Sequence, residues 1–185
     1  MIDYNKIKLL ILDCDGVLSD GMVIYSEDNI ESKAFSTKDG LGLILLRFTD
    51  IKVAVITGRS SKALVRRTDD LKLNFLYQGV KNKVATAQNI IDGMGIGWEN
   101  VAFMGDDLND YPLLKKVGFT ATTESAPERI KQLASFVSTL PGGNGAVREY
   151  VEYILQKQNR FEQVVDKYLE DLLLKSKVLP KSINQ

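Results

Sequence analysis

The sequence predicts an α/β protein in which a parallel sheet carries helices on both faces. Apolar, β-branched runs at 7–12, 51–56, 73–77 and 100–104 have the length expected of buried strands. Stretches of helical character separate these runs, and strands that alternate with helices of this size are typical of a parallel sheet. The 185 residues are enough for one domain with a substantial core.

The remaining elements follow in order along the chain. A weaker apolar run at 117–121 predicts a fifth strand. The predicted helices fill the intervals between strands and lie at 39–48, 60–71, 81–94, 110–116 and 126–133. Ligands of such sheets bind at the carboxyl ends of the strands, so the polar residues that follow each strand are the functional candidates.

Residues 17–36 interrupt the alternation and predict a β-hairpin. Segments 23–25 and 31–35 flank a polar turn at 27–29. The hairpin would project from the sheet beside Asp13. This position favours a lid or a subunit contact, while an ordinary connection stays open as the alternative.

The C-terminal region 146–174 is predicted to be helical. Apolar side chains recur there at helical spacing from Val147 to Leu173, so this stripe is expected to pack on the domain or on a neighbouring molecule. We therefore expect a domain over 1–158 and a C-terminal helical extension over 159–185.

The composition has no strong charge bias. Lys plus Arg equals Asp plus Glu at 24 each, so we expect no general attraction to nucleic acid or to anionic membranes. No apolar run approaches the ~20 residues of a transmembrane helix, and the N-terminal run does not have the plan of a signal peptide. Cys14 is the single cysteine and cannot form an internal disulfide, which favours a cytoplasmic location.

The chain contains no histidine. Serine–histidine and cysteine–histidine catalysis are therefore excluded within the chain, as is zinc held by histidine. Its chemistry must depend on Asp, Lys, Thr and a hard cation.

Two carboxylates, Asp13 and Asp15, directly follow the first predicted strand. Residues i and i+2 of an extended chain point to the same side, so these side chains could share one small volume while Cys14 points the opposite way. Crowded carboxylates repel each other and require a cation, a shared proton or open water. The pair therefore predicts a metal site or acid–base chemistry.

Polar residues also follow the other predicted strands. They are Thr57, Gly58 and Arg59 after 51–56, Lys83 near the start of a helix, and Asp106, Asp107 and Asp110 after 100–104. Taken singly, each group has a structural explanation as a turn, a helix cap, a solvated lysine or an acidic helix N-terminus. Their joint occurrence at successive strand ends favours one shared site.

Four motifs mark these strand ends: Asp-x-Asp-Gly-Val at 13–17, Thr-Gly at 57–58, a lone Lys83, and Gly-Asp-Asp-x-x-Asp at 105–110. In this order they resemble the haloacid dehalogenase superfamily of phosphotransferases. The resemblance implies a three-layer, Rossmann-like parallel sheet and the hydrolysis of a phosphomonoester.

The same resemblance implies a role for each polar residue. Asp13 would be the nucleophile that forms an aspartyl-phosphate, and Asp15 would be the general acid and base. Mg²⁺ would be held by Asp13, Asp106 and the backbone carbonyl of Asp15. The remaining implied roles are phosphoryl binding by Thr57, Gly58 and Lys83, and support of the metal shell or of Lys83 by Asp107 and Asp110.

The intervals between the motifs leave no room for a cap domain, which many members of this superfamily carry. Five further stretches are DGVLSDG at 15–21, KAF at 33–35, KDGLG at 38–42, YQG at 77–79 and GGxGAVRE at 142–149. They are similar to the capless, tetrameric 3-deoxy-D-manno-octulosonate 8-phosphate phosphatase family. This finer resemblance implies an enzyme of lipopolysaccharide biosynthesis and a homotetramer whose subunits shield the open site.

The resemblance also bears on the substrate. It implies a substrate loop at 142–148, with a glycine-rich helix entry as the alternative. Arg59, which stands where a nine-carbon relative is acidic, would suit the carboxylate of the octulosonate, and Arg67 is a weaker candidate. Because the tail beyond 158 departs from the usual short form, 2-keto-3-deoxynononate or N-acylneuraminate 9-phosphate stays open as the substrate.

Two alternatives come from other classes. A receiver-like phosphoacceptor domain also gathers acidic residues, a Thr and a Lys around Mg²⁺, but the order of the motifs here argues against it. A catalytically silent subunit that only promotes assembly is disfavoured because all the catalytic side chains are present.

Overall fold

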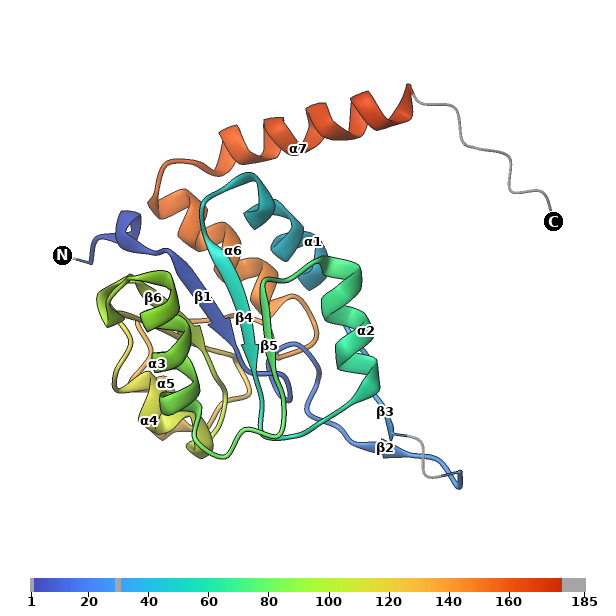
Figure 1. Ribbon diagram of the computed structural model, residues 1–185, viewed down its shortest axis with the longest axis vertical. Helices are drawn as coiled ribbons and strands as arrows, with labels where there is room; N and C mark the ends of the chain where they lie inside the picture. Colours follow the sequence, from blue (N-terminus) through green and yellow to red (C-terminus); the bar gives the residue numbers. More distant parts are fainter. Residues whose placement is uncertain (1, 29–30, 178–185) are drawn as a thin grey trace.

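A six-stranded parallel sheet lies between two layers of helices in the computed structural model, which describes residues 2–28 and 31–177 (Figure 1). The strands lie side by side in the order β5-β4-β1-β6-β7-β8. Their bounds are β1 (Leu9–Leu12), β4 (Lys52–Ile56), β5 (Phe75–Tyr77), β6 (Val101–Met104), β7 (Phe119–Thr122) and β8 (Phe136–Val137). All pairs in this sheet are parallel, which confirms the predicted fold class.

The helices follow the predicted order, and most are shorter than predicted. They are α1 (Thr37–Leu45), α2 (Lys62–Leu71), α3 (Lys83–Met94), α4 (Tyr111–Leu114), α5 (Glu128–Lys131), α6 (Ala146–Lys157) and α7 (Phe161–Ser176). Four 3-10 turns are η1 (Tyr4–Lys6), η2 (Leu46–Phe48), η3 (Trp98–Asn100) and η4 (Leu108–Asp110). The predicted helix at 39–48 therefore ends as a 3-10 turn, and β8 is a strand that the apolar pattern missed because it has only two residues.

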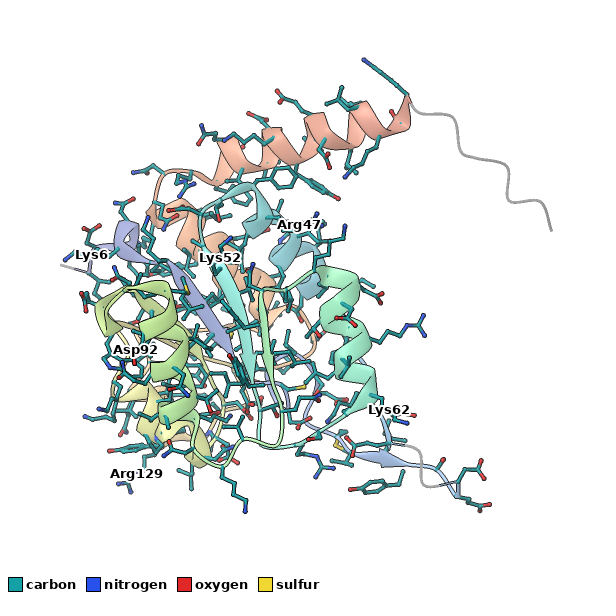
Figure 2. All side chains as sticks on the ribbon, viewed as in Figure 1. Lys6, Arg47, Lys52, Lys62, Asp92 and Arg129 are labelled. Carbon is teal, nitrogen blue, oxygen red and sulfur yellow. The ribbon has the colours of Figure 1, made fainter. Side chains whose placement is uncertain are left out.

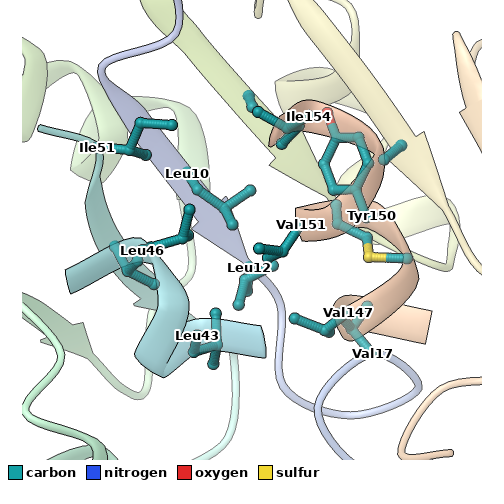
Figure 3. Close-up of a cluster of buried hydrophobic side chains, with 14 of the residues drawn as sticks. Leu10, Leu12, Val17, Leu43, Leu46, Ile51, Val147, Tyr150, Val151 and Ile154 are labelled. Carbon is teal, nitrogen blue, oxygen red and sulfur yellow. The ribbon is translucent and has the colours of Figure 1, made fainter. Parts of the chain in front are cut away.

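The central strand β1 is buried on both faces. Leu10 and Leu12 belong to the core cluster that includes α1 and α6, whereas Leu9 and Ile11 belong to the cluster that includes α3, α4 and α5. Figure 3 shows Leu10 and Leu12 among side chains of the α1–η2 segment and of α6. A strand held from both sides leaves its carboxyl end little freedom, and the residue at that end is Asp13.

The predicted hairpin is present but short. Strands β2 (Ile24–Tyr25) and β3 (Glu31–Ser32) form an antiparallel pair separate from the main sheet. The pair projects from the body (Figure 1), and Met22 and Tyr25 are 64% and 69% exposed. Residues 29–30, which include the last residue of the predicted turn at 27–29, lie outside the described residues.

The predicted helical C-terminal region consists of two helices. The break lies at 158–160, where Asn159 adopts a left-handed φ of 53°. Helix α6 packs in the core, whereas α7 extends past the body at the top of Figure 1 and buries only Val164. The last predicted residues of the extension, 178–185, lie outside the described part of the chain.

Many charged side chains lie on the outside of the molecule, whereas Asp13, Asp39, Lys83 and Asp110 are buried. Figure 2 labels six of the exposed ones: Lys6, Arg47, Lys52, Lys62, Asp92 and Arg129. Over residues 2–28 and 31–177, no helix combines the length and the apolar composition needed to cross a membrane.

Candidate active site

A cavity of about 350 Å³ opens at the carboxyl edge of the sheet. Its walls come from the segments after β1, β4 and β6, which is the edge where ligands of parallel sheets bind. The lining residues are Asp13, Asp15, Gly16, Asp20, Gly21, Met22, Thr57, Gly58, Arg59, Asp106, Asp107 and Asn109. The structure thus brings together most of the residues predicted from separate strand ends.

An acidic cluster lies at this cavity, which two of its members, Asp13 and Asp106, line. Oxygens of Asp13, Asp106 and Asp110 lie within 4.8 Å of one another. Lys83 is the cation nearest to them, with its Nζ 2.8 Å from Asp13 Oδ1 and 2.6 Å from Asp110 Oδ1. Asn82 caps the helix that carries Lys83, because its side chain accepts a hydrogen bond from the Ala85 amide.

The buried carboxylates hold their protons more tightly than usual. Burial raises the pKa of Asp13 to about 6, with the charge of Asp110 adding to the effect and Lys83 opposing it. Burial, together with the charges of Asp13 and Asp110, raises the pKa of Asp106 to about 7. Three carboxylates against one ammonium leave an excess of negative charge that a divalent cation would neutralise.

One oxygen of the cluster indicates where such a cation would bind. Asp106 Oδ1 is buried and has no hydrogen-bond partner among the described residues. A buried carboxylate oxygen without a partner is costly, and Mg²⁺ prefers hard oxygen ligands. Asp13 and Asp106 therefore fit a Mg²⁺ site.

Asp110 is fully buried, and both of its oxygens already accept hydrogen bonds. Oδ1 accepts from Lys83 Nζ, and Oδ2 accepts from the Asp106 amide at 2.9 Å. This geometry orients Lys83 and the Asp106 backbone. Asp107, by contrast, is exposed and caps η4, where its Oδ1 accepts from the Leu108 amide at 2.7 Å.

Glycines allow the loops around the cluster to approach each other. Gly16 has a φ of +82°, and a Cβ at this position would lie 1.9 Å from Asp106 Oδ2. A Cβ on Gly142 would lie 1.9 Å from the Gly16 carbonyl oxygen, and the Gly143 amide donates to Val17 O at 2.9 Å. The 142–148 segment, expected to be a substrate loop, therefore packs against the 16–20 backbone, and none of its residues lines the cavity.

The segment after β4 contributes a second wall. Thr57 is buried, and its Oγ1 accepts a long hydrogen bond of 3.4 Å from the Arg59 amide. The guanidinium of Arg59 lies over the cavity and reaches the hairpin, where Nη2 donates to Tyr25 OH at 3.1 Å and to Glu31 Oε2 at 2.8 Å. Arg59 is therefore already paired with a carboxylate of the chain itself.

Arg67 is placed differently from its prediction as a substrate ligand. Its Nη2 donates to Ser36 O at 2.8 Å, and its guanidinium carbon lies 6.0 Å from the centre of the Phe35 ring. Arg67 is not among the residues that line the cavity. Its contact with Ser36, the N-cap residue of α1, supports the start of that helix instead.

Lys33 is a site residue that the sequence pattern missed. Its side chain is only 1% exposed; its Nζ forms an ion pair with Asp15 Oδ1 and lies 3.3 Å from Glu31 Oε1. Two signals in the sequence pointed to it: the stretch KAF at 33–35 that resembles the phosphatase family, and the spacing of Glu31 and Lys33, which places both on one face of an extended segment. Their contact with Asp15 depends on how the hairpin folds back, which spacing does not reveal.

Comparisons with known proteins agree with this geometry. The family of haloacid dehalogenase-like hydrolases matches residues 73–150. The chain is 39% identical over 163 residues to the 3-deoxy-D-manno-octulosonate 8-phosphate phosphatase KdsC of Escherichia coli strain B / BL21-DE3, covering 88% of this chain and 87% of that relative.

Solved structures show the same similarity. The phosphatase of this name from Moraxella catarrhalis, in complex with magnesium, phosphate and a KDO molecule, has a TM-score of 0.86 and 37% identity, covering 90% of this chain and 95% of that one. The cobalt-bound enzyme from Haemophilus influenzae has a TM-score of 0.82 and 35% identity, covering 86% and 93%.

Proposed function

The chain belongs to the 3-deoxy-D-manno-octulosonate 8-phosphate phosphatase family of haloacid dehalogenase-like hydrolases, and from this premise we propose that it is a Mg²⁺-dependent phosphatase. It cleaves 3-deoxy-D-manno-octulosonate 8-phosphate to the free sugar acid and inorganic phosphate. One observation carries the proposal: Asp13, Asp106 and Lys83 meet at the carboxyl edge of the sheet. A carboxylate nucleophile, a metal site and a phosphate-binding cation are what this phosphoryl transfer requires.

In the proposed mechanism, two carboxylates carry the chemistry. Asp13 attacks phosphorus and the ester oxygen leaves, so that an aspartyl-phosphate forms. Asp15 donates a proton to the leaving oxygen and later takes one from the water that hydrolyses the acyl phosphate. The two acids differ in their surroundings, since Asp13 is buried against Lys83 whereas Asp15 faces Lys33 and Arg59.

The remaining groups hold charge in place. Asp13, Asp106 and the Asp15 carbonyl would hold Mg²⁺, which would supply positive charge that offsets the repulsion between an anionic nucleophile and a phosphate dianion. Lys83 holds a phosphoryl oxygen, and Asp110 holds Lys83 in position. Thr57, Gly58 and Asp107 are proposed to complete the phosphate and metal surroundings, because all three line the cavity.

The substrate fits beside the acidic cluster. A second cavity of about 380 Å³ shares Gly58 and Asn109 with the first and extends the available space past Lys83. Arg59 is proposed to bind the substrate carboxylate through donors other than the Nη2 that pairs with Glu31. The nine-carbon 2-keto-3-deoxynononate or N-acylneuraminate 9-phosphate is the second candidate substrate, on the ground that the two cavities leave room beyond the phosphate.

A homotetramer and a cytoplasmic location complete the proposal. Among the residues that the structure describes, none forms a cap over the site, and the segment 22–25 exposes Met22, Ile24 and Tyr25, which a neighbouring subunit would cover. Cys14, the only cysteine, is buried and unpaired. Light scattering of the purified protein measures the assembly directly, and a monomer at micromolar concentration would refute the tetramer.

Phosphate release tests the function. We expect Mg²⁺-dependent turnover that is abolished by EDTA and by Asp13→Asn, because the first removes the cation and the second the nucleophile. Turnover that survives either treatment contradicts the mechanism. A long-lived phosphoprotein without multiple turnover would indicate a receiver-like domain, and a folded protein with no turnover would indicate a silent subunit.

A panel of three phosphates tests the substrate. We expect 3-deoxy-D-manno-octulosonate 8-phosphate to have a higher kcat/KM than the nononate and neuraminate 9-phosphates. A preference for either nine-carbon substrate would overturn the choice of sugar acid and leave the chemistry unchanged.

A further inference from the structure

The carboxylate of Asp15 contacts Lys33, which has no role in the proposed mechanism. Lys33 follows β3, and its Nζ is ion-paired with Asp15 Oδ1 while its side chain is 1% exposed. A lysine is rarely buried to this degree unless its charge is paired. The pairing partner is the residue that transfers the proton, which makes the contact a functional one.

Lys33 distinguishes the two oxygens of Asp15. The ammonium group of Lys33 can only donate hydrogen bonds. Oδ1 of Asp15 accepts one of them, so its lone pairs are engaged by the lysine. The Ser19 hydroxyl lies 3.4 Å from the same Oδ1. Oδ2 has no hydrogen-bond partner among the described residues, and the Arg59 Nε is 4.0 Å away. Oδ2 is therefore the oxygen of Asp15 that is left to face the substrate.

Glu31 connects Lys33 to the opposite side of the carboxylate. Its Oε1 lies 3.3 Å from Lys33 Nζ, and its Oε2 lies 2.8 Å from Arg59 Nη2. Asp15, Lys33, Glu31 and Arg59 thus form a closed ring of alternating charge between the β1 loop, the hairpin and the β4 loop. Each member restrains its neighbours, so the ring fixes the orientation of Asp15 rather than only its charge.

We propose that Lys33 is a positioning residue for proton transfer, holding Asp15 by Oδ1 so that Oδ2 faces the leaving oxygen of the substrate. The proposal rests on the proposed function, because it assigns Asp15 the proton transfer. It explains why the hairpin directly follows the catalytic loop: the hairpin supplies the group that orients the acid. Misplacing a catalytic group by a small distance is enough to slow a reaction markedly.

The leaving group of the substrate tests this role. The sugar-acid phosphate has an alkoxide leaving group that needs a proton, whereas p-nitrophenyl phosphate releases a stable phenolate that does not. We expect Lys33→Met to lower kcat/KM about 10-fold or more for the sugar-acid phosphate and to leave p-nitrophenyl phosphate within about 3-fold, since general acid catalysis contributes about 100-fold or more. Because kcat/KM reports steps up to departure of the leaving group, later hydrolysis of the aspartyl-phosphate does not mask the effect.

Matched variants accompany this measurement. Lys33→Arg keeps the charge and should restore part of the lost activity toward the sugar-acid phosphate. Lys52→Met removes an exposed lysine at the opposite end of β4 from Thr57, and both substrates should be unaffected. Should Lys33→Met not fold, as judged by circular dichroism, Lys33→Gln replaces it with the same expectation.

The outcomes separate the two proposals. An equal loss on both substrates, or no loss on the sugar-acid phosphate, overturns the positioning role of Lys33. If the wild-type enzyme hydrolyses neither phosphate, the proposed function itself has failed. A selective loss with partial rescue by Lys33→Arg supports the inference.

Discussion

Single residues decide the chemistry at the carboxyl end of β1. Asp13 and Asp15 are two positions apart, yet one is buried against Lys83 and the other is paired with Lys33. Cys14 points the opposite way into the core, as alternation along an extended chain predicts, and burial raises the pKa of its thiol to about 12. A thiol in this environment is unreactive.

Gly16 determines how closely the β1 loop approaches Asp106. We predict that Gly16→Ala weakens Mg²⁺ binding at least about 10-fold, because the new Cβ would meet Asp106 Oδ2 and the φ of +82° disfavours a side chain. The measurement is the Mg²⁺ concentration at half-maximal phosphatase activity.

Gly93→Ala is the matched control for this variant. Gly93 lies in α3 with nothing within 4 Å of an added Cβ, so alanine there should leave Mg²⁺ activation unchanged and stabilise the helix slightly. Unchanged activation in Gly16→Ala would contradict the close approach of the two loops.

At the scale of elements, one buried carboxylate anchors the start of α6. Asp39, on α1, is 1% exposed and accepts hydrogen bonds from the Gly145 and Arg148 amides at 3.1 and 2.9 Å. We predict that Asp39→Ala lowers the free energy of unfolding by about 1–3 kcal/mol, because both amides lose a buried acceptor. Urea denaturation measures the change.

Asp70→Ala provides the comparison, because Asp70 is an exposed acidic residue on α2. Its effect should stay within about 0.5 kcal/mol, as for most surface substitutions. A similar loss from both variants would indicate that the Asp39 contacts contribute nothing specific.

An ion-pair cluster connects the C-terminal helices to the sheet. Asp50 pairs with Lys8 and, at 3.1 Å, with Arg160 just before α7. The hydrogen bond from Lys8 lowers the pKa of Asp50 to about 2, although partial burial acts to raise it. A lowered carboxyl pKa stabilises the fold above the ordinary value of about 3.8, and this contribution disappears as the pH falls from there to about 2.

We therefore predict a pH-dependent effect of Asp50→Asn. Because Lys8 and Asp50 are about half exposed, the loss at pH 7 should be at most about 1 kcal/mol. Urea denaturation at pH 7, 4, 3 and 2 should show the difference from wild type shrinking toward zero at the lowest pH. A difference that is constant over this range would contradict the ion pair as its cause.

For the whole molecule, the division of the chain at residue 158 stays a prediction. Helix α7 contacts the body mainly through Val164 and through the ring of Tyr168, which lies 6.0 Å from that of Phe48. Ending the chain after Gln158 should cost about 2–4 kcal/mol of unfolding free energy, from one buried side chain and one ring contact. Hydrolysis of p-nitrophenyl phosphate should persist, and its loss in a folded, shortened protein would show that α7 belongs to the catalytic domain.

The catalytic assembly was predictable where local signals were strong. Asp13, Thr57 and Asp106 each follow an apolar run, and carboxyl ends of parallel strands meet at one edge. The contact made by Arg67 was not predictable in this way, because helical spacing does not reveal that its guanidinium donates to Ser36 O. The hydrogen bonds that anchor the start of α6 were equally unpredictable, since Asp39 and Gly145 are far apart in the chain.

The sequence by itself determined the fold class, placed the candidate residues Asp13, Thr57 and Asp106 after strands and Lys83 at the start of a helix, and left no room for a cap between the motifs. Apolar periodicity and motif order are local properties, which is why they could be read from the sequence. Only the tertiary structure decided what each group touches. The pairing of Asp15 with Lys33, of Arg59 with Glu31 and of Gly16 with Asp106 arises from loops that pack across the edge of the sheet. Such contacts depend on distances between segments, which no spacing along the chain specifies.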